Sequence, residues 1–250
     1  MKLTAAKKRF IAWWTSLALN SESPKTILAL DPSLQATGWA IFKDGELLDS
    51  GSLDTPTSKY STREQLEAIS TLVDEKVFEY VPGFVVTEAI NVAKKFTGVR
   101  GVSLANGAVI SSIYEPETIF YSIPVQSIKA SHEYESEEGE DSKQASIKAA
   151  LGVFGIDVGE DDNRADAMLI GRMACRISDI MSDLREIDPW DDETIRLKLK
   201  EHSKTKLGSS CVNRLLTPDT LKDADAKEHR KAVYRVGSGW PVILKRAGRS

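Results

Sequence analysis

The amino-acid sequence predicts an α/β protein in which helices flank a mixed β-sheet. Short apolar segments bounded by proline or glycine are typical of buried strands, and apolar residues that recur every three or four positions are typical of helices. In chain order these patterns predict three strands, then a helix, a strand, a helix, a strand and two helices. Consecutive strands followed by alternating helices and strands indicate a mixed sheet covered by helices.

The first three strands are predicted within residues 26–53. The segment TILALD (26–31) is short and apolar and lies between two prolines, so we expect a buried strand there. The segment TGWAIFKDGELLDSGSL (37–53) contains Asp44-Gly45, and this dipeptide is among the strongest short-range signals for the turn of a β-hairpin. The three strands are therefore expected to be antiparallel neighbours.

The next part of the chain alternates between helices and strands. Ser61 and Glu64 form a capping-box pattern at the start of a helix, and Pro82-Gly83 marks its end. The segments after it predict a strand, a helix and a strand, over residues 84–88, 102–114 and 118–124.

Two helices complete the predicted core. Asp141 and Gln144 are placed to cap the first of them, and Gly155 is its expected stop. The apolar face of this helix is expected to be Ile147, Leu151 and Phe154. The last core helix begins near the segment DDNRADAMLIGRMACRI (161–177).

Composition divides the chain into three parts. Residues 24–182 hold the predicted strands and helices and are expected to form one domain. Residues 1–23 combine basic residues with an apolar run that tryptophans interrupt, which favours a short amphipathic helix over a signal peptide. Residues 183–250 are expected to be a charged extension, basic at its end. An acidic loop is expected over residues 132–141.

The composition also predicts the cellular setting. No apolar stretch is long enough to span a bilayer, so no membrane partner is expected. Cys175 and Cys211 lack any metal-ligand spacing and are expected to be reduced thiols of a cytoplasmic protein. The net charge of −4 argues weakly against nucleic acid. The two chain ends are basic, however, and they are expected either to grip phosphates or to be solvated tails.

Acidic residues end two of the predicted strands and begin a helix. Asp31 ends the first strand and Glu88 the fourth, and if these strands are parallel neighbours both carboxylates emerge at the carboxyl edge of the sheet. In DDNRADA, Asp162 and Asp166 are four residues apart and Asn163 and Asp166 three apart, so either pair shares one helix face. Any one of these acids alone is more often a cap or a turn residue.

Oxygen ligands from three separate elements suit Mg²⁺. Two such ions about 3.5–4 Å apart can activate a water and stabilise the leaving oxygen of a phosphodiester. The order of the acids along the chain therefore favours a metal-dependent site at this edge of the sheet.

Five segments resemble the RuvC family of Holliday junction resolvases, and the resemblance covers roughly residues 25–180. They are ILALDPSLQATGWAIF, VVTEAI, VRGVSLANGAVISSI, YSIPVQSIKASHEYESEEGEDSKQASIKAAL and DDNRADAMLIGR, in the order that the family has them. The phage-type members are the most similar in character. The resemblance implies a ribonuclease H-like fold with a five-stranded mixed sheet, and a metal-dependent endonuclease that resolves four-way DNA junctions by paired symmetric cuts.

The resemblance also implies roles for particular residues. Asp31, Glu88 and Asp166 match catalytic metal ligands of the family. Asn163 stands where many members have a further aspartate, so the fourth ligand is either Asn163 or Asp162. The ions are expected to be Mg²⁺, with Mn²⁺ as a substitute and two ions in each site, and no small-molecule cofactor is expected.

Basic and aromatic residues are expected to contact the DNA. Lys129 and Lys143 match family lysines near the scissile phosphate, where a cation neutralises charge that develops in the transition state. The segment NVAKKFTGVR (91–100) follows the Glu88 strand and carries Lys94, Lys95, Phe96 and Arg100. An exposed Phe96 would stack on or wedge between bases, whereas a buried one would only fill the core beneath the loop.

Several functions remain open at this point. Two symmetric cuts need two active sites, so the resolvase is expected to act as a homodimer on branched DNA, in a bacterial host's cytoplasm if a phage encodes it. Flap or fork cleavage by the same site is the nearest alternative, and a non-catalytic junction-binding protein is another. A sugar-kinase or actin-like ATPase would need a duplicated domain and glycine-rich phosphate loops, for which the chain has neither the length nor the motifs.

Overall fold

The computed structural model describes residues 26–89, 96–113, 118–124, 128, 141–185, 187 and 191–216. The strands are β1 (Thr26–Asp31), β2 (Ala36–Lys43), β3 (Glu46–Asp54), β4 (Phe84–Ala89) and β5 (Ile119–Pro124). The helices are α2 (Thr62–Tyr80), α3 (Phe96–Ser112), α5 (Ser142–Phe154), α6 (Asp162–Arg185), α7 (Asp192–His202) and α8 (Lys206–Leu216). The predicted helix at 1–23, the acidic loop up to residue 140 and the basic end of the chain lie outside the described residues.

The five strands form one mixed sheet, as the sequence predicts. The strand order is β3-β2-β1-β4-β5. β1 pairs antiparallel with β2, and β2 with β3, through a hairpin whose turn is Asp44-Gly45. β1 also pairs parallel with β4, and β4 with β5. The strand that ends in Asp31 therefore lies at the centre of the sheet, beside the strand that carries Glu88.

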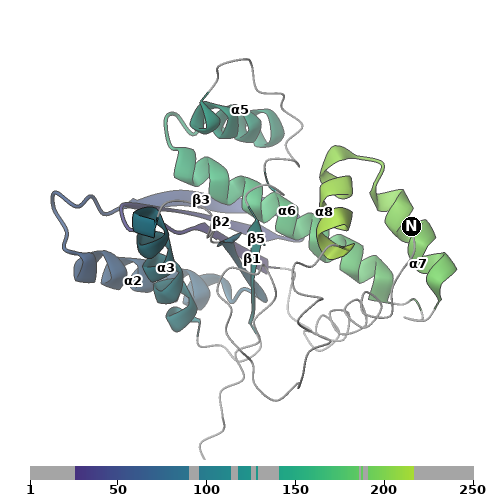
Figure 1. The fold of residues 1–250 in the computed structure, drawn as a ribbon, viewed down its shortest axis with the longest axis horizontal. Helices are drawn as coiled ribbons and strands as arrows, with labels where there is room; N and C mark the ends of the chain where they lie inside the picture. The colour runs from purple at the N-terminus through teal and green to yellow at the C-terminus, as the bar shows by residue number, and fades with distance from the viewer. Residues whose placement is uncertain are drawn as a thin grey trace, which may run out of the picture.

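Helices cover both faces of this sheet (Figure 1). Side chains alternate between the faces along each strand. Leu28, Leu30 and Val85 pack with residues of α2 and α3 in one apolar cluster. Ala29, Phe42 and Val86 pack with residues of α5 and α6 in the other. We call these the α2/α3 face and the α6 face of the sheet.

The α6 face extends beyond the nuclease domain expected from the sequence. Leu199 of α7 and Leu207, Cys211 and Val212 of α8 belong to the same apolar cluster as α6. The Cys211 Sγ lies 3.8 Å from the main-chain oxygen of Met173 in α6. Both predicted thiols, Cys175 and Cys211, are free and buried. The boundary at residue 182 stays a prediction, with two helices packed on α6 after it.

Two helices cover the α2/α3 face, and its strand residues Leu28, Leu30 and Val85 are fully buried. Between the two helices lies a groove of about 680 Å³, lined by Leu66, Leu104, Gly107 and Ala108 among others. The capping box predicted for α2 is present, since the Ser61 side chain accepts from the Glu64 backbone N–H and the Glu64 carboxylate accepts from the Ser61 backbone N–H. Val81 then ends α2 in a left-handed conformation.

Two predicted details of the helices are wrong. α3 begins at Phe96 instead of residue 102, because the helix runs through Gly101, which packs beside Leu34. Glycine lowers helix propensity, so the sequence pattern placed the start too late. In α5, Ile147 and Phe154 pack against the core cluster as predicted, but Leu151 is 44% exposed and the fully buried positions are Ser146, Ala149 and Ala150. Small residues allow α5 to pack closely on α6.

The caps of α5 agree with the sequence. Asp141 is its N-cap, and Gly155 ends it in a left-handed conformation. None of the helices among the described residues is long and apolar enough to cross a lipid bilayer.

Candidate active site

The carboxyl ends of β1 and β4 bring Asp31 and Glu88 to one place. Leu30 pairs with Thr87 in the parallel register, so Asp31 and Glu88 are the next residues of adjacent strands. Ala29 and Val86, two residues earlier in each strand, belong to the cluster on the α6 face. Because strand side chains alternate with a period of two, Asp31 and Glu88 also lie on that face. This confirms the predicted neighbourhood of the two strands.

Gly38 brings the start of α6 onto the same edge of the sheet. Gly38 pairs with Asp31 across β1 and β2. A Cβ atom added to Gly38 would overlap the main-chain carbonyl of Asn163. Only glycine therefore allows the first turn of α6 to approach the sheet here. The TG dipeptide of β2 thus places the segment DDNRADA directly beside Asp31.

Asp161 links the same turn of α6 to the edge strand β3 through hydrogen bonds. Its Oδ1 accepts from the Arg164 backbone N–H at 2.9 Å, which is the geometry of a helix N-cap. Its Oδ2 accepts from the Ser52 hydroxyl at 2.7 Å. The Arg164 Nε also donates to the Ser50 hydroxyl at 3.0 Å. One carboxylate therefore both caps α6 and ties it to β3.

Gly38 and Asp161 were missed as positioning residues in the sequence. An aspartate directly before a predicted helix is a recognisable N-cap signal, so Asp161 was within reach of pattern reasoning. Gly38 contacts Asn163, which is far away in the chain, so no local sequence pattern predicts this contact.

The pKa of Asp31 is affected by the charges of the other predicted site residues. Burial of its carboxyl group raises the pKa of Asp31 well above its usual range. The negative charges of Asp166, Glu88 and Asp162 raise this pKa further, whereas Lys143 lowers it. Four acids and one lysine from β1, β4, α5 and α6 therefore lie near one another.

Lys143 forms an ion pair with Asp162 across two helix starts. The distance from Lys143 Nζ to Asp162 Oδ2 is 2.7 Å, and the two side chains are 64% and 19% exposed. The hydrogen bond to Asp162 and the charge of Asp162 raise the pKa of Lys143. Lys143 is thus a charged ammonium group at the rim of the acidic cluster, open to solvent on one side.

The carboxylates gathered at this edge of the sheet are of the chemical type that binds a hard divalent cation. Carboxylate oxygens from Asp31, Glu88, Asp162 and Asp166 are the ligands that Mg²⁺ prefers, and they come from three separate elements. Among the described residues, no three His, Cys, Asp or Glu side chains are close enough together to hold an ion as they stand. The backbone brings the carboxylates together, and side-chain rotation would have to complete the ligand shell.

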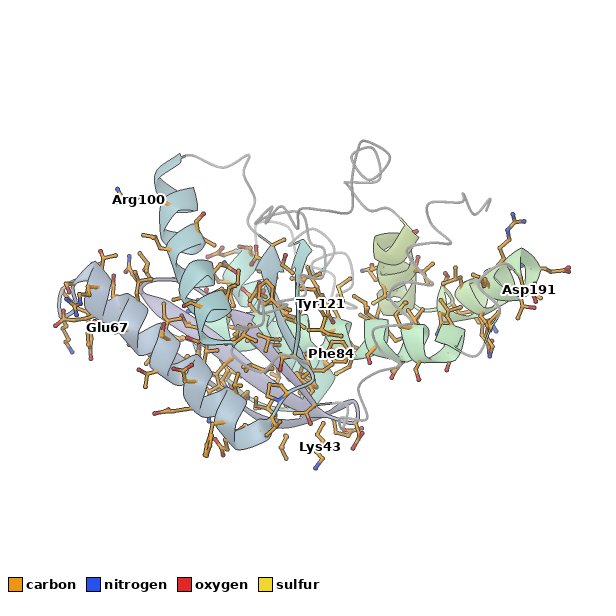
Figure 2. The ribbon with its side chains drawn as sticks, turned by 90° about the horizontal axis from the view of Figure 1, so that it is seen from below. Lys43, Glu67, Phe84, Arg100, Tyr121 and Asp191 are labelled. Atoms are coloured by element: carbon orange, nitrogen blue, oxygen red, sulfur yellow. The ribbon has the colours of Figure 1, made fainter. Side chains whose placement is uncertain are left out.

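The structure describes only some of the other predicted site residues. Asn163 is half-buried in the first turn of α6. Arg100 is exposed on α3 and points away from the ribbon in Figure 2. Phe96 is the first residue of α3, but its side chain lies outside the described residues, as do Lys94, Lys95 and Lys129. Their predicted DNA contacts stay predictions.

These observations define the class of protein. A central parallel pair β1–β4, an antiparallel hairpin beside it and a helix that crosses the sheet next to the two strand ends form the ribonuclease H-like fold. The predicted fold class is confirmed.

One part of the chain is similar to a known protein family. Residues 27–144 match the sequence model of the family described as crossover junction endodeoxyribonuclease RuvC. The chain is therefore similar to this family from β1 to the start of α5. The match ends before α6, so Asp162, Asn163 and Asp166 lie beyond it. The phage-type character stays a prediction.

Solved structures and curated proteins were also compared. Thermus thermophilus RuvC in complex with a Holliday junction substrate has a TM-score of 0.49 at 19% identity, over 59% of this chain and 91% of that one. A second Thermus thermophilus RuvC structure gives 0.48 at 19%, over 60% and 93%. The yeast mitochondrial Holliday junction resolvase Ydc2 gives 0.47 at 11%, over 72% and 89%. No curated protein is a significant match to the chain.

Proposed function

We propose that this chain is a metal-dependent endonuclease that resolves four-way DNA junctions by paired, symmetric hydrolysis of phosphodiester bonds. The observation that carries the proposal is the placement of Asp31 and Glu88 beside the first turn of α6, which holds Asp162 and Asp166, in a chain whose residues 27–144 match the RuvC family model. Branch-shaped DNA would be recognised mainly through its phosphates and geometry.

The site residues would hold divalent ions, and we propose Mg²⁺, with Mn²⁺ able to replace it. Asp31, Glu88 and Asp166 are the proposed ligands, joined by Asp162 or Asn163. When bound, two such ions supply an activated water and stabilise the leaving oxygen of the phosphodiester. The protein's own part is to hold the acids at a fixed edge of the sheet, through Gly38 and through the Asp161 contacts to β3.

Basic residues around this edge would position the DNA. The Lys143 side chain stands at the rim of the cluster and is 64% exposed, so its ammonium group is accessible to a phosphate oxygen. We also propose that Lys94, Lys95, Phe96, Arg100 and Lys129 contact the junction. Salt should weaken such binding steeply, because phosphate contacts release counterions.

We further propose that the chain acts as a homodimer. A four-way junction has approximate two-fold symmetry, and a C₂ dimer presents two identical active sites to it. Each protomer would then make one of the two cuts.

The test is cleavage of a labelled synthetic four-way junction, with Mg²⁺ and with EDTA, beside linear duplex and flap substrates. Paired symmetric nicks are expected with Mg²⁺ only. Asp31→Asn should lower the cleavage rate by about 100-fold or more, because it removes a ligand charge from the metal site. Asp74→Asn, an exposed acid of α2 on the opposite face, is the matched control and should cut normally.

Each other outcome of this test would select a different function. Preferential cleavage of flaps or forks would keep the site and change the substrate. Tight junction binding with no cutting at any Mg²⁺ or Mn²⁺ concentration would indicate a non-catalytic junction-binding protein. The sequence left this alternative open because Asn163 stands where many RuvC family members have an aspartate.

A further inference from the structure

Lys143 and Asp162 form an ion pair at the rim of the proposed metal site, and each partner also has a proposed role of its own there. Lys143 is the second residue of α5, a position where a positive charge opposes the helix dipole. The N-cap Asp141 offsets this only in part, since its carboxylate already accepts from the Lys143 backbone N–H. The helix dipole disfavours a lysine at this position, and the 2.7 Å ion pair with Asp162 is the close contact of its ammonium group.

Asp162 is the stronger candidate for the fourth ligand. It is the first residue of α6, four residues before Asp166, so both lie on one face of the helix. Its charge acts on Asp31, as the charges of Glu88 and Asp166 do. Asn163 is neutral, and its main-chain carbonyl packs against Gly38. A shift of one residue would thus supply the carboxylate that position 163 lacks.

We propose that Lys143 holds Asp162 in the metal-free protein and that a divalent cation competes with Lys143 for this carboxylate. The inference rests on the proposed metal-dependent function. Binding of the cation would release the ammonium group of Lys143, which then faces solvent at the rim where a phosphate would lie. Occupation of the metal site and neutralisation of the scissile phosphate are in this way coupled through one side chain.

If Lys143 competes with the cation, removing Lys143 should strengthen metal binding. Mn²⁺ binding to the full-length protein without DNA is measured by isothermal titration calorimetry. Lys143→Met should tighten Mn²⁺ binding by about threefold, the scale of one partly exposed ion pair. Asp162→Asn should weaken it by about tenfold or more. Lys143→Arg keeps the positive charge and should bind Mn²⁺ nearly as the unchanged protein does.

The double variant separates competition from simple charge repulsion. If Lys143 acts by holding Asp162, then Lys143→Met in the Asp162→Asn background should cause no further tightening. If Lys143 merely repels the cation through space, the tightening should persist in that background, and the proposal is then wrong. Weakened or unchanged Mn²⁺ binding by Lys143→Met alone would overturn it as well.

Matched controls complete the experiment. Lys59→Met removes an exposed lysine from a turn, and Glu160→Gln removes an exposed acid two residues before Asp162. Neither should change Mn²⁺ affinity, and thermal melts in EDTA check that every variant is folded. Junction cleavage by the unchanged protein is scored separately, so the proposed function can stand while this inference fails.

Discussion

The two faces of the sheet are covered in different ways. On the α6 face, main chain approaches main chain at Gly38, and polar contacts from Asp161 and Arg164 tie the helix to β3. On the α2/α3 face the helices rest on apolar side chains, and a groove of about 680 Å³ stays open between them. The face that carries the acidic cluster is the one on which the helix position is fixed most closely. Such close fixing is what a site with several ligands from different elements requires.

The largest difference between the faces is expected in thiol reactivity. Burial raises the pKa of Cys175 and of Cys211, both on the α6 face, to about 12. At pH 8 a thiol-disulfide reagent should therefore react with them about 10³-fold more slowly than with an exposed cysteine. Ser111→Cys would provide that exposed cysteine at the edge of the groove. Fast reaction of both native thiols would show that the α6 face opens readily.

A pair of glycine variants tests the close approach directly. Gly38→Ala should lower the free energy of unfolding by about 3 kcal/mol, because its Cβ overlaps the Asn163 carbonyl. Gly107→Ala on the other face meets no atom within 4 Å, and it should raise the free energy of unfolding by about 0.5–1 kcal/mol through helix propensity. Urea titrations measure both. Equal effects of the two variants would remove the distinction between the faces.

The two helix caps give a smaller and more specific test. Asp161→Ala and Ser61→Ala each remove an N-cap and should each cost about 1 kcal/mol of stability. Only Asp161→Ala should also slow junction cleavage, by about tenfold, since it loosens the turn that carries Asp162 and Asp166. Asp161→Asn keeps a capping oxygen and should recover most of the rate. If Ser61→Ala slows cleavage equally, cleavage follows global stability and not the cap of α6.

The smallest expected effect is the pH dependence of the α2 cap. Hydrogen bonds from the Ser61 hydroxyl and backbone N–H lower the pKa of Glu64 below its ordinary value. A lowered pKa in the folded state contributes stability above the unfolded pKa of about 4.3, and this contribution is lost as the pH falls through the folded pKa. The stability difference between the unchanged protein and Glu64→Ala should therefore narrow between pH 7 and pH 3.5 in urea titrations. A constant difference would mean that the carboxylate charge is not what stabilises the cap.

Local sequence patterns predicted the five strands and the antiparallel order of the first three. The Asp44-Gly45 turn, the Ser61 capping box and the Gly155 stop are each decided within a few residues of chain, so composition and spacing reveal them. The convergence of Asp31 and Glu88 depended on the condition that β1 and β4 are parallel neighbours, and the structure meets this condition.

The missed features depend on contacts between distant segments. Gly38 meets Asn163, and Lys143 meets Asp162, only after the chain has folded. α7 was missed for a different reason. It lies in a strongly charged segment and has Ile195 and Leu199 as its two fully buried apolar residues, which is too short a repeat to recognise.

The packing of α7 and α8 against α6 has a practical consequence for preparing the protein. A fragment cut at residue 182 would keep the acidic residues but lose Leu199, Leu207 and Cys211, which are buried in the same apolar cluster as α6. Such a fragment would expose apolar surface of α6 to solvent and should tend to aggregate during purification. The shortest well-behaved version for crystallisation should therefore run to residue 216, the last residue of α8.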